Sequence, residues 1–200
     1  MKKKLLIVII GFTILISLII INPGQFFTLT FLRILGHYRT PKIETFESIK
    51  EYVNSKSLIY DRLYGLSTMN ARDELNHSGV TGVPTIQIFN KDKVLLRMAE
   101  QSDCTWVLAN YFKEGHSNEM VAQDSTTYGY VMDRLLPIDV KTSQDTFDYY
   151  LISYWAKFIP KLSHKLFDQT NVMKESMTQK VCFIYVTLDE QESWKEGTMN

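Results

Sequence analysis

A strand–helix–strand pattern in the last third of the 200-residue chain constrains its fold more than any other feature. Residues 148–155 are a nearly continuous apolar and aromatic run, which is typical of a buried strand. Residues 158–173 have the spacing of an amphipathic helix, and residues 180–188 repeat the buried-strand pattern. Two strands joined by a helix of this length run parallel, with a right-handed crossover. The pattern therefore predicts an α/β protein.

A second pair of strands is predicted in the first half of the chain. Residues 84–89 alternate between apolar and polar side chains, and residues 94–98 return as a partner strand after a polar turn. A short run over residues 57–60 also favours a strand. Thr45 is a suitable N-cap for the first of three expected helices. These helices cover residues 43–53, 69–76 and 104–112.

The middle of the chain carries less pattern. Residues 113–146 are rich in Gly, Ser, Asn and Gln, which indicates a long connection or a boundary, with a short helix or strand over residues 128–136. After the second buried strand, residues 189–194 predict a helix. Its acidic first turn, with Asp189, Glu190 and Glu192, is expected to be solvated, because carboxylates suit the positive end of the helix dipole.

An uncharged apolar run over residues 5–21 follows three lysines, Lys2–Lys4. As a helix it would be ~26 Å long, which is adequate for a hydrocarbon core of ~30 Å. A cleaved signal peptide would have a shorter apolar region and small residues at a cleavage site, which Ile20–Gly24 lacks. We therefore favour an uncleaved membrane anchor, and cleavage stays the alternative. The lysines favour a cytoplasmic N-terminus and a body on the periplasmic or extracytoplasmic side.

The predicted organisation has three parts. A membrane anchor over residues 1–22 is followed by a connector over residues 23–42 and a body over residues 43–200, with sub-units 43–113 and 145–200. The chain has 22 basic and 22 acidic side chains, and three of the basic ones precede the apolar run, so the body has a slight acidic excess. Nucleic-acid binders usually show a strong basic surplus. We therefore expect no nucleic-acid partner.

Short motifs lie at the ends of the predicted strands. Tyr154-Trp155-Ala156 ends the first buried strand, and Leu188-Asp189-Glu190 with Trp194 follows the second. In these residues the segment resembles the membrane-anchored thioredoxins and redoxins of bacterial envelopes. Gly82-Val83-Pro84-Thr85 resembles the loop that in thioredoxins holds a cis-proline beside the active site. The resemblance implies a thioredoxin-like sheet with flanking helices, preceded here by one transmembrane helix.

The order of these motifs differs from that of the family. In thioredoxins the proline loop follows the Cys-x-x-Cys helix, whereas in this chain it precedes the corresponding helix. Two arrangements fit this order: a permuted domain with one sheet, or two partial units packed together. We favour a single sheet, because each half alone gives a sheet too small to bury both of its faces.

The thioredoxin cysteines are missing from this chain. The resemblance aligns them with Ile159 and Leu162, which supply neither a nucleophilic thiolate nor a resolving thiol. We therefore expect a non-catalytic binding or scaffolding protein of the cell envelope that holds a protein or peptide partner. In the family the turn before this helix faces the partner, so we expect it to be exposed. The candidate binding surface consists of Phe158, Ile159, Pro160, Val83 and Pro84.

Two other functions remain open. Cys104 begins a predicted helix, and a thiol at that position suits a redox protein that works through a single cysteine. Asp103 opposes this function, because a neighbouring carboxylate raises a thiol pKa. Cys182, between Val181 and Phe183, is expected in the core. The third possibility is a subunit of a larger membrane assembly.

Sites for metals and cofactors are not expected. The four histidines share no metal-ligand spacing, and the chain contains no glycine-rich phosphate loop. These residues are His37, His77, His116 and His164.

Overall fold

The structure is a computed structural model, and it describes residues 33, 36–76, 80, 82–97, 109–110, 112–116, 120–123, 127–144 and 146–196. The chain divides into two compact units, Met1–Arg39 and Thr40–Asn200. The predicted anchor, residues 5–21, lies outside the described residues, as does Cys104. No helix in the described ranges combines the length and apolar character needed to cross a bilayer.

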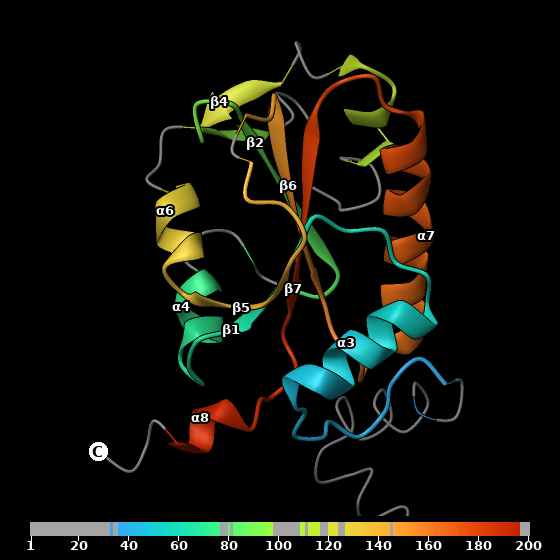
Figure 1. Ribbon diagram of the computed structural model, residues 1–200, viewed down its shortest axis with the longest axis vertical. Helices are drawn as coiled ribbons and strands as arrows, with labels where there is room; N and C mark the ends of the chain where they lie inside the picture. The colour runs from blue at the N-terminus through green and yellow to red at the C-terminus, as the bar shows by residue number, and fades with distance from the viewer. Residues whose placement is uncertain are drawn as a thin grey trace, which may run out of the picture. The chain divides into compact units, whose positions relative to one another are not determined.

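One mixed sheet of seven strands forms the centre of the second unit (Figure 1). Its strand order is β4-β3-β2-β6-β7-β1-β5, so strands from both predicted sub-units share it and the prediction of a single sheet is confirmed. The strands are β1 Arg62–Leu66, β2 Thr85–Asn90, β3 Leu95–Arg97, β4 Val121–Gln123, β5 Leu135–Val140, β6 Tyr149–Trp155 and β7 Val181–Thr187.

The predicted strand–helix–strand unit is confirmed. Strands β6 and β7 are parallel neighbours, and helix α7, Pro160–Ser176, connects them. All seven residues of β7 are buried, and so are the last six of β6. Such strands need cover on both faces, which explains their unbroken apolar sequence.

The predicted hairpin is confirmed as the antiparallel pair β2 and β3. Strand β2 also pairs antiparallel with β6, with Thr85 opposite Tyr154. The Val83–Pro84 peptide bond, which is cis, directly precedes β2. The start of β2 therefore lies beside the end of β6, although some 70 residues separate them in the sequence.

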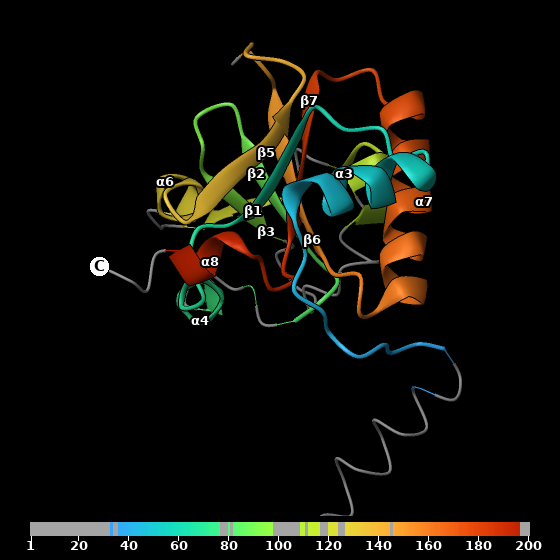
Figure 2. The ribbon, with the colours of Figure 1, turned by 60° about the horizontal axis from the view of Figure 1, so that its bottom comes forward.

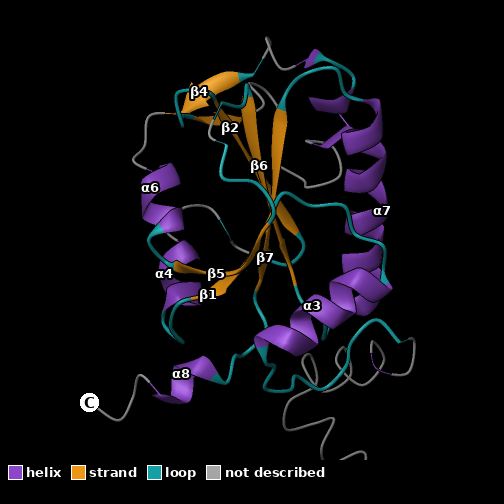
Figure 3. Ribbon diagram, viewed as in Figure 1, coloured by secondary structure: helices purple, strands orange, loops and turns teal. Residues whose placement is uncertain are grey.

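Helices cover both faces of the sheet (Figures 1, 2 and 3). Helix α3, Phe46–Ser55, lies with α7 on one side, and Thr45 caps α3 as predicted by accepting a hydrogen bond from Ser48 N. The other side carries α4, Ala71–Asn76, and α6, Thr127–Met132. The short helix α8, Ser193–Glu196, follows β7.

The two cores alternate along each central strand. In β6, Leu151 and Trp155 pack on the α3 and α7 side, whereas Ile152 and Tyr154 pack on the α4 and α6 side. This is the period-two alternation of a strand that is buried on both faces. The residues that follow β6 and β7 are consequently attached to strands that are packed on both faces.

Some predictions of secondary structure differ from the structure. The short helix or strand expected over residues 128–136 is present as α6, but the same 113–146 segment also contains strands β4 and β5, of which β4 was not predicted. Residues 57–60 lie outside any strand, and β1 begins at Arg62. Helix α8 begins at Ser193, later than predicted, because Gln191 still pairs with Glu44 in an isolated parallel bridge.

Candidate functional site

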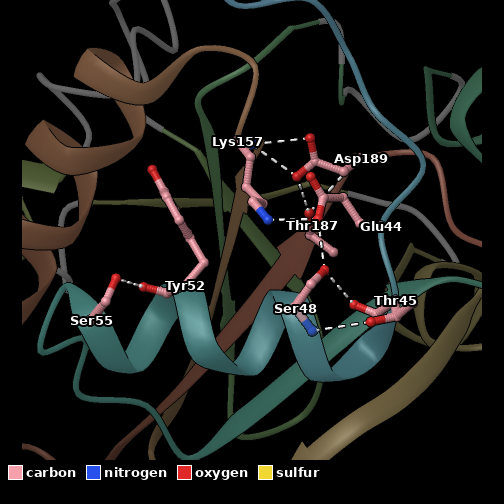
Figure 4. Close-up of polar contacts among 8 residues, drawn as sticks. All are labelled: Glu44, Thr45, Ser48, Tyr52, Ser55, Lys157, Thr187 and Asp189. Carbon is pink, nitrogen blue, oxygen red and sulfur yellow. Dashed lines mark hydrogen bonds and ion pairs between the residues drawn. The ribbon is translucent and has the colours of Figure 1, made fainter.

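Polar side chains gather where the parallel strands β6 and β7 end. In open α/β sheets, ligands bind outside the carboxyl ends of the strands. Lys157 follows β6, Asp189 lies two residues after β7, and both approach the residues at the start of α3 (Figure 4). We call this set the Lys157 cluster, and it consists of Lys157, Asp189, Thr187, Glu44 and Ser48.

Asp189 is the most deeply buried acid of the cluster. Its side chain accepts hydrogen bonds from Lys157 N at 3.0 Å to Oδ1 and 2.8 Å to Oδ2, and from Thr187 Oγ1 at 2.7 Å. Burial raises the pKa of the Asp189 carboxyl, and the hydrogen bonds from Lys157 and Thr187 oppose that rise. Asp189 is only 2% exposed, so the prediction that it lies in a solvated helix start is wrong.

Glu44 supplies the second carboxylate. Its Oε2 lies 2.5 Å from Lys157 Nζ and accepts a hydrogen bond of 2.6 Å from Ser48 Oγ. Its main chain is also held, because Glu44 N donates to Glu190 O and Glu192 N donates to Glu44 O. The ion pair is largely shielded from solvent, with 22% of the Lys157 side chain and 10% of the Glu44 side chain exposed.

A buried amide adjoins the cluster. Gln191 is 2% exposed, and neither its Nε2 nor its Oε1 has a hydrogen-bond partner within the described part of the chain. The amide lies over Gly65, where a Cβ would come within 2.3 Å of it. Gly65 pairs with Thr187 across the β1–β7 ladder, so the amide lies next to the Thr187 end of the cluster. A side chain at position 65 would displace Gln191.

Aromatic rings form the inner wall of the site. Tyr52 stacks on Trp155 with ring centres 5.6 Å apart and planes 7° from parallel. The Tyr52 hydroxyl lies 3.0 Å from His164 Nε2, and Lys157 Nζ is 5.4 Å from the Tyr52 ring centre. The ammonium of Lys157 thus has a π face on one side and a carboxylate on the other.

The two parts of the predicted binding surface follow from strand ends that pair. Thr85 lies opposite Tyr154, so the Val83–Pro84 loop before β2 and the turn after β6, which contains Phe158 and Ile159, are at the same end of these two strands. Each of these four residues is partly exposed. Pro160 was expected to be exposed, but it is buried. It is the first residue of α7, a position that favours proline, and its ring packs inward there. The Arg72 guanidinium of α4 lies 6.0 Å from the Phe158 ring centre.

Cys182 lies in the core as predicted. It is fully buried within β7, and burial raises the pKa of its thiol to about 12.

We expect the Cys104→Ser chain, whose one remaining thiol is Cys182, to react with a disulfide reagent about a thousandfold more slowly when native than when denatured. Absorbance of the released thiol measures both rates. Similar native and denatured rates would contradict the buried position.

Sequence reasoning missed the Lys157 cluster. Lys157 and Glu44 are 113 residues apart, and Lys157 and Asp189 are 32 apart, so no local motif joins them. The one available signal was a charged residue two positions after each buried strand. Among the described residues, no group of three His, Cys, Asp or Glu side chains could hold a metal ion.

The chain was compared with known proteins in three ways. No protein-family model matches it, no curated protein matches it, and no solved structure matches it.

Proposed function

We propose that this chain is a membrane-anchored, non-catalytic binding protein of the cell envelope, built on a permuted thioredoxin-like sheet. Residues 5–21 would hold it in the membrane, and the lysines before them favour a body on the extracytoplasmic side. Its partner would be a protein or peptide that docks on the turn between β6 and α7. The comparisons name no relative, so the proposal rests on the residues themselves.

The register between β2 and β6 is the observation that carries this proposal. Thr85 pairs with Tyr154, and this supports a surface to which both the Val83–Pro84 loop before β2 and the Phe158–Ile159 turn after β6 contribute. The thioredoxin resemblance implies that these two segments together contact a partner. A partly exposed apolar surface on rigid strand ends suits a bound polypeptide, because little side-chain freedom is lost on binding.

The side chains near the proposed binding surface favour binding of the partner without a chemical reaction. Ile159 and Leu162 stand where the resemblance places the two thiols, and neither side chain is a nucleophile. The Lys157 ammonium is already neutralised by Glu44, and the Cys182 thiol is buried in the core. These features support binding without thiol exchange.

Site-specific photo-crosslinking in membranes tests the binding surface. A photoreactive residue at Ile159 is expected to capture a discrete partner. Phe158→Ala in the same chain should cut the yield at least tenfold, because truncation of a central aromatic anchor commonly costs ~2 kcal/mol or more of binding energy. The matched control carries the photoreactive residue at Val172, an exposed position on α7. Equal capture from both positions, or no effect of Phe158→Ala in a chain that melts normally, would contradict the proposal.

A further inference from the structure

Lys157 and Ser48 hold one carboxylate between them. Glu44 Oε2 receives both the Lys157 ammonium at 2.5 Å and the Ser48 hydroxyl at 2.6 Å. The donors come from separate elements, the β6–α7 turn and helix α3, and the carboxylate comes from a third segment, the residues just before α3 (Figure 4). The ammonium and the hydroxyl both make charge-assisted hydrogen bonds to the carboxylate, which are stronger than bonds between neutral groups, and the Ser48 hydroxyl also lies 2.9 Å from Thr45 O.

Polar contacts hold the segment that carries Glu44. Its main chain makes two hydrogen bonds with residues 190–192, and the neighbouring Ile43 side chain is 47% exposed. Helix α3 is capped by Thr45, so the helix does not need Glu44 in order to begin. Displacement of the Glu44 side chain thus costs its contacts with Lys157 and Ser48 and leaves the Thr45 cap in place.

Unused hydrogen-bonding capacity lies beside the cluster. The Gln191 amide is 2% exposed, and both of its polar atoms lack a partner among the residues that the structure describes. Buried amides are normally hydrogen-bonded, and an unsatisfied one is costly. The amide lies over Gly65, which pairs with Thr187, so it is at the same end of the sheet as the Lys157 cluster. The Gln191 amide therefore offers a donor and an acceptor that no described residue uses.

We propose that Lys157 and Ser48 form a binding site for an acidic side chain of a partner polypeptide, and that Glu44 occupies it as an autoinhibitory contact when no partner is bound. This assignment rests on the proposed function. It adds that the partner docking at the β6–α7 turn carries an acidic side chain. The Phe158 ring lies near Arg72 of α4, whereas the Lys157 ammonium lies near Tyr52 of α3. A partner that packs on Phe158 and Ile159 therefore reaches Lys157 by passing across the β6–α7 turn, and it presents an Asp or Glu there.

Acetate tests the carboxylate site without any partner. In the full chain, Glu44→Ala removes the internal carboxylate and leaves Lys157 and Ser48. We expect about 100 mM sodium acetate to raise the Tm of this variant by about 3 °C more than sodium chloride of equal ionic strength, as a ligand with a Kd near ~10 mM would. The Glu44→Ala/Lys157→Met chain should show no such difference. The matched control is Glu47→Ala, an exposed acid on the same helix.

Each outcome decides the proposal. An acetate response absent from Glu44→Ala, or equal in the Glu47→Ala control, overturns the carboxylate site. If Glu44→Ala does not fold in chloride, recovery of its far-ultraviolet circular dichroism signal in acetate supports the site. If that signal does not recover, although Glu44→Gln folds, the carboxylate site is overturned.

Photo-crosslinking separates this inference from the proposed function. Removal of the internal carboxylate by Glu44→Ala should raise partner capture at Ile159 severalfold, and an unchanged yield overturns the autoinhibitory role. If capture at Ile159 is lost while the acetate response persists, the turn-binding proposal fails. If acetate has no effect while capture depends on Phe158, the carboxylate site alone fails.

Discussion

Replacing Trp155 with alanine is expected to lower the free energy of unfolding by about 4 kcal/mol, since removal of a large aromatic from a packed core costs both its burial and the cavity left behind. Trp155 is fully buried at the end of β6. Its ring stacks on Tyr52 at 5.6 Å and meets Phe167 edge-on at 5.1 Å. The residue thus joins α3, α7 and the sheet, and its loss loosens all three.

Trp155→Phe is the matched control for this substitution. It keeps a ring between Tyr52 and Phe167, and it removes an indole N–H that has no hydrogen-bond partner in the described ranges. The cost should therefore be about 1 kcal/mol or less. Denaturant titration followed by circular dichroism measures both values in the full chain. A loss below about 1 kcal/mol for Trp155→Ala would show that the stack does not hold the two helices.

Lys157→Met is expected to lower the free energy of unfolding by about 2 to 3 kcal/mol at pH 7, because it leaves two shielded carboxylates without their cation. Glu44 loses its ion pair at 2.5 Å, and Asp189 loses a nearby positive charge. The loss stays below that of a fully buried pair because 22% of the Lys157 side chain is exposed. Lys50→Met is the control: its pair with Asp139 spans 3.4 Å and 43% of the lysine side chain is exposed, so about 0.5 kcal/mol is expected.

The loss caused by Lys157→Met should grow as the pH rises. Burial raises the pKa of Asp189 in the folded protein, so the folded state keeps that proton to a higher pH than the unfolded chain does. Stability therefore falls as pH rises from the unfolded carboxyl pKa, about 4, towards the pKa of folded Asp189. Removing the Lys157 charge raises the folded pKa further and widens that window. Unfolding titrations at several pH values measure the trend, and a loss independent of pH would contradict it.

The central strands could be predicted because their sequences carry a strong signal. Strands β6 and β7 are buried on both faces, and this makes their sequences almost continuously apolar. The hairpin β2–β3 was equally clear, because a polar turn separates two β-prone runs. In each case one local stretch of sequence contains the whole signal.

Most of strand β5 was not predicted, because it is an edge strand. Pro137 and Asp139 interrupt its apolar pattern, and five of its six residues are partly buried or exposed. A proline has no amide to donate and is tolerated where a strand has a neighbour on one side only. The pairing of β5 with β1 therefore comes from tertiary contacts that composition does not reveal.

The Lys157 cluster could not be predicted for a different reason. The acidic residues after β7 read as the solvated start of a helix, and that interpretation fits their local sequence. Asp189 instead turns inward because Lys157 N and Thr187 Oγ1 offer donors there. Only the relative placement of β6, β7 and α3 makes this visible.

The position of β7 in the chain has a consequence for how the protein folds. Strand β7 lies between β6 and β1 in the sheet. It is made long after β1, and Phe183 N of β7 donates a hydrogen bond to Asp61, 122 residues earlier in the chain. Contacts of such long sequence separation slow folding, because a large loop must close before they are made. During synthesis, β1 and β6 lack their shared neighbour until residues 181–187 have emerged. The edges of β1 and β6 that pair with β7 therefore stay unpaired until residues 181–187 have been made, and unpaired strand edges are prone to aggregation.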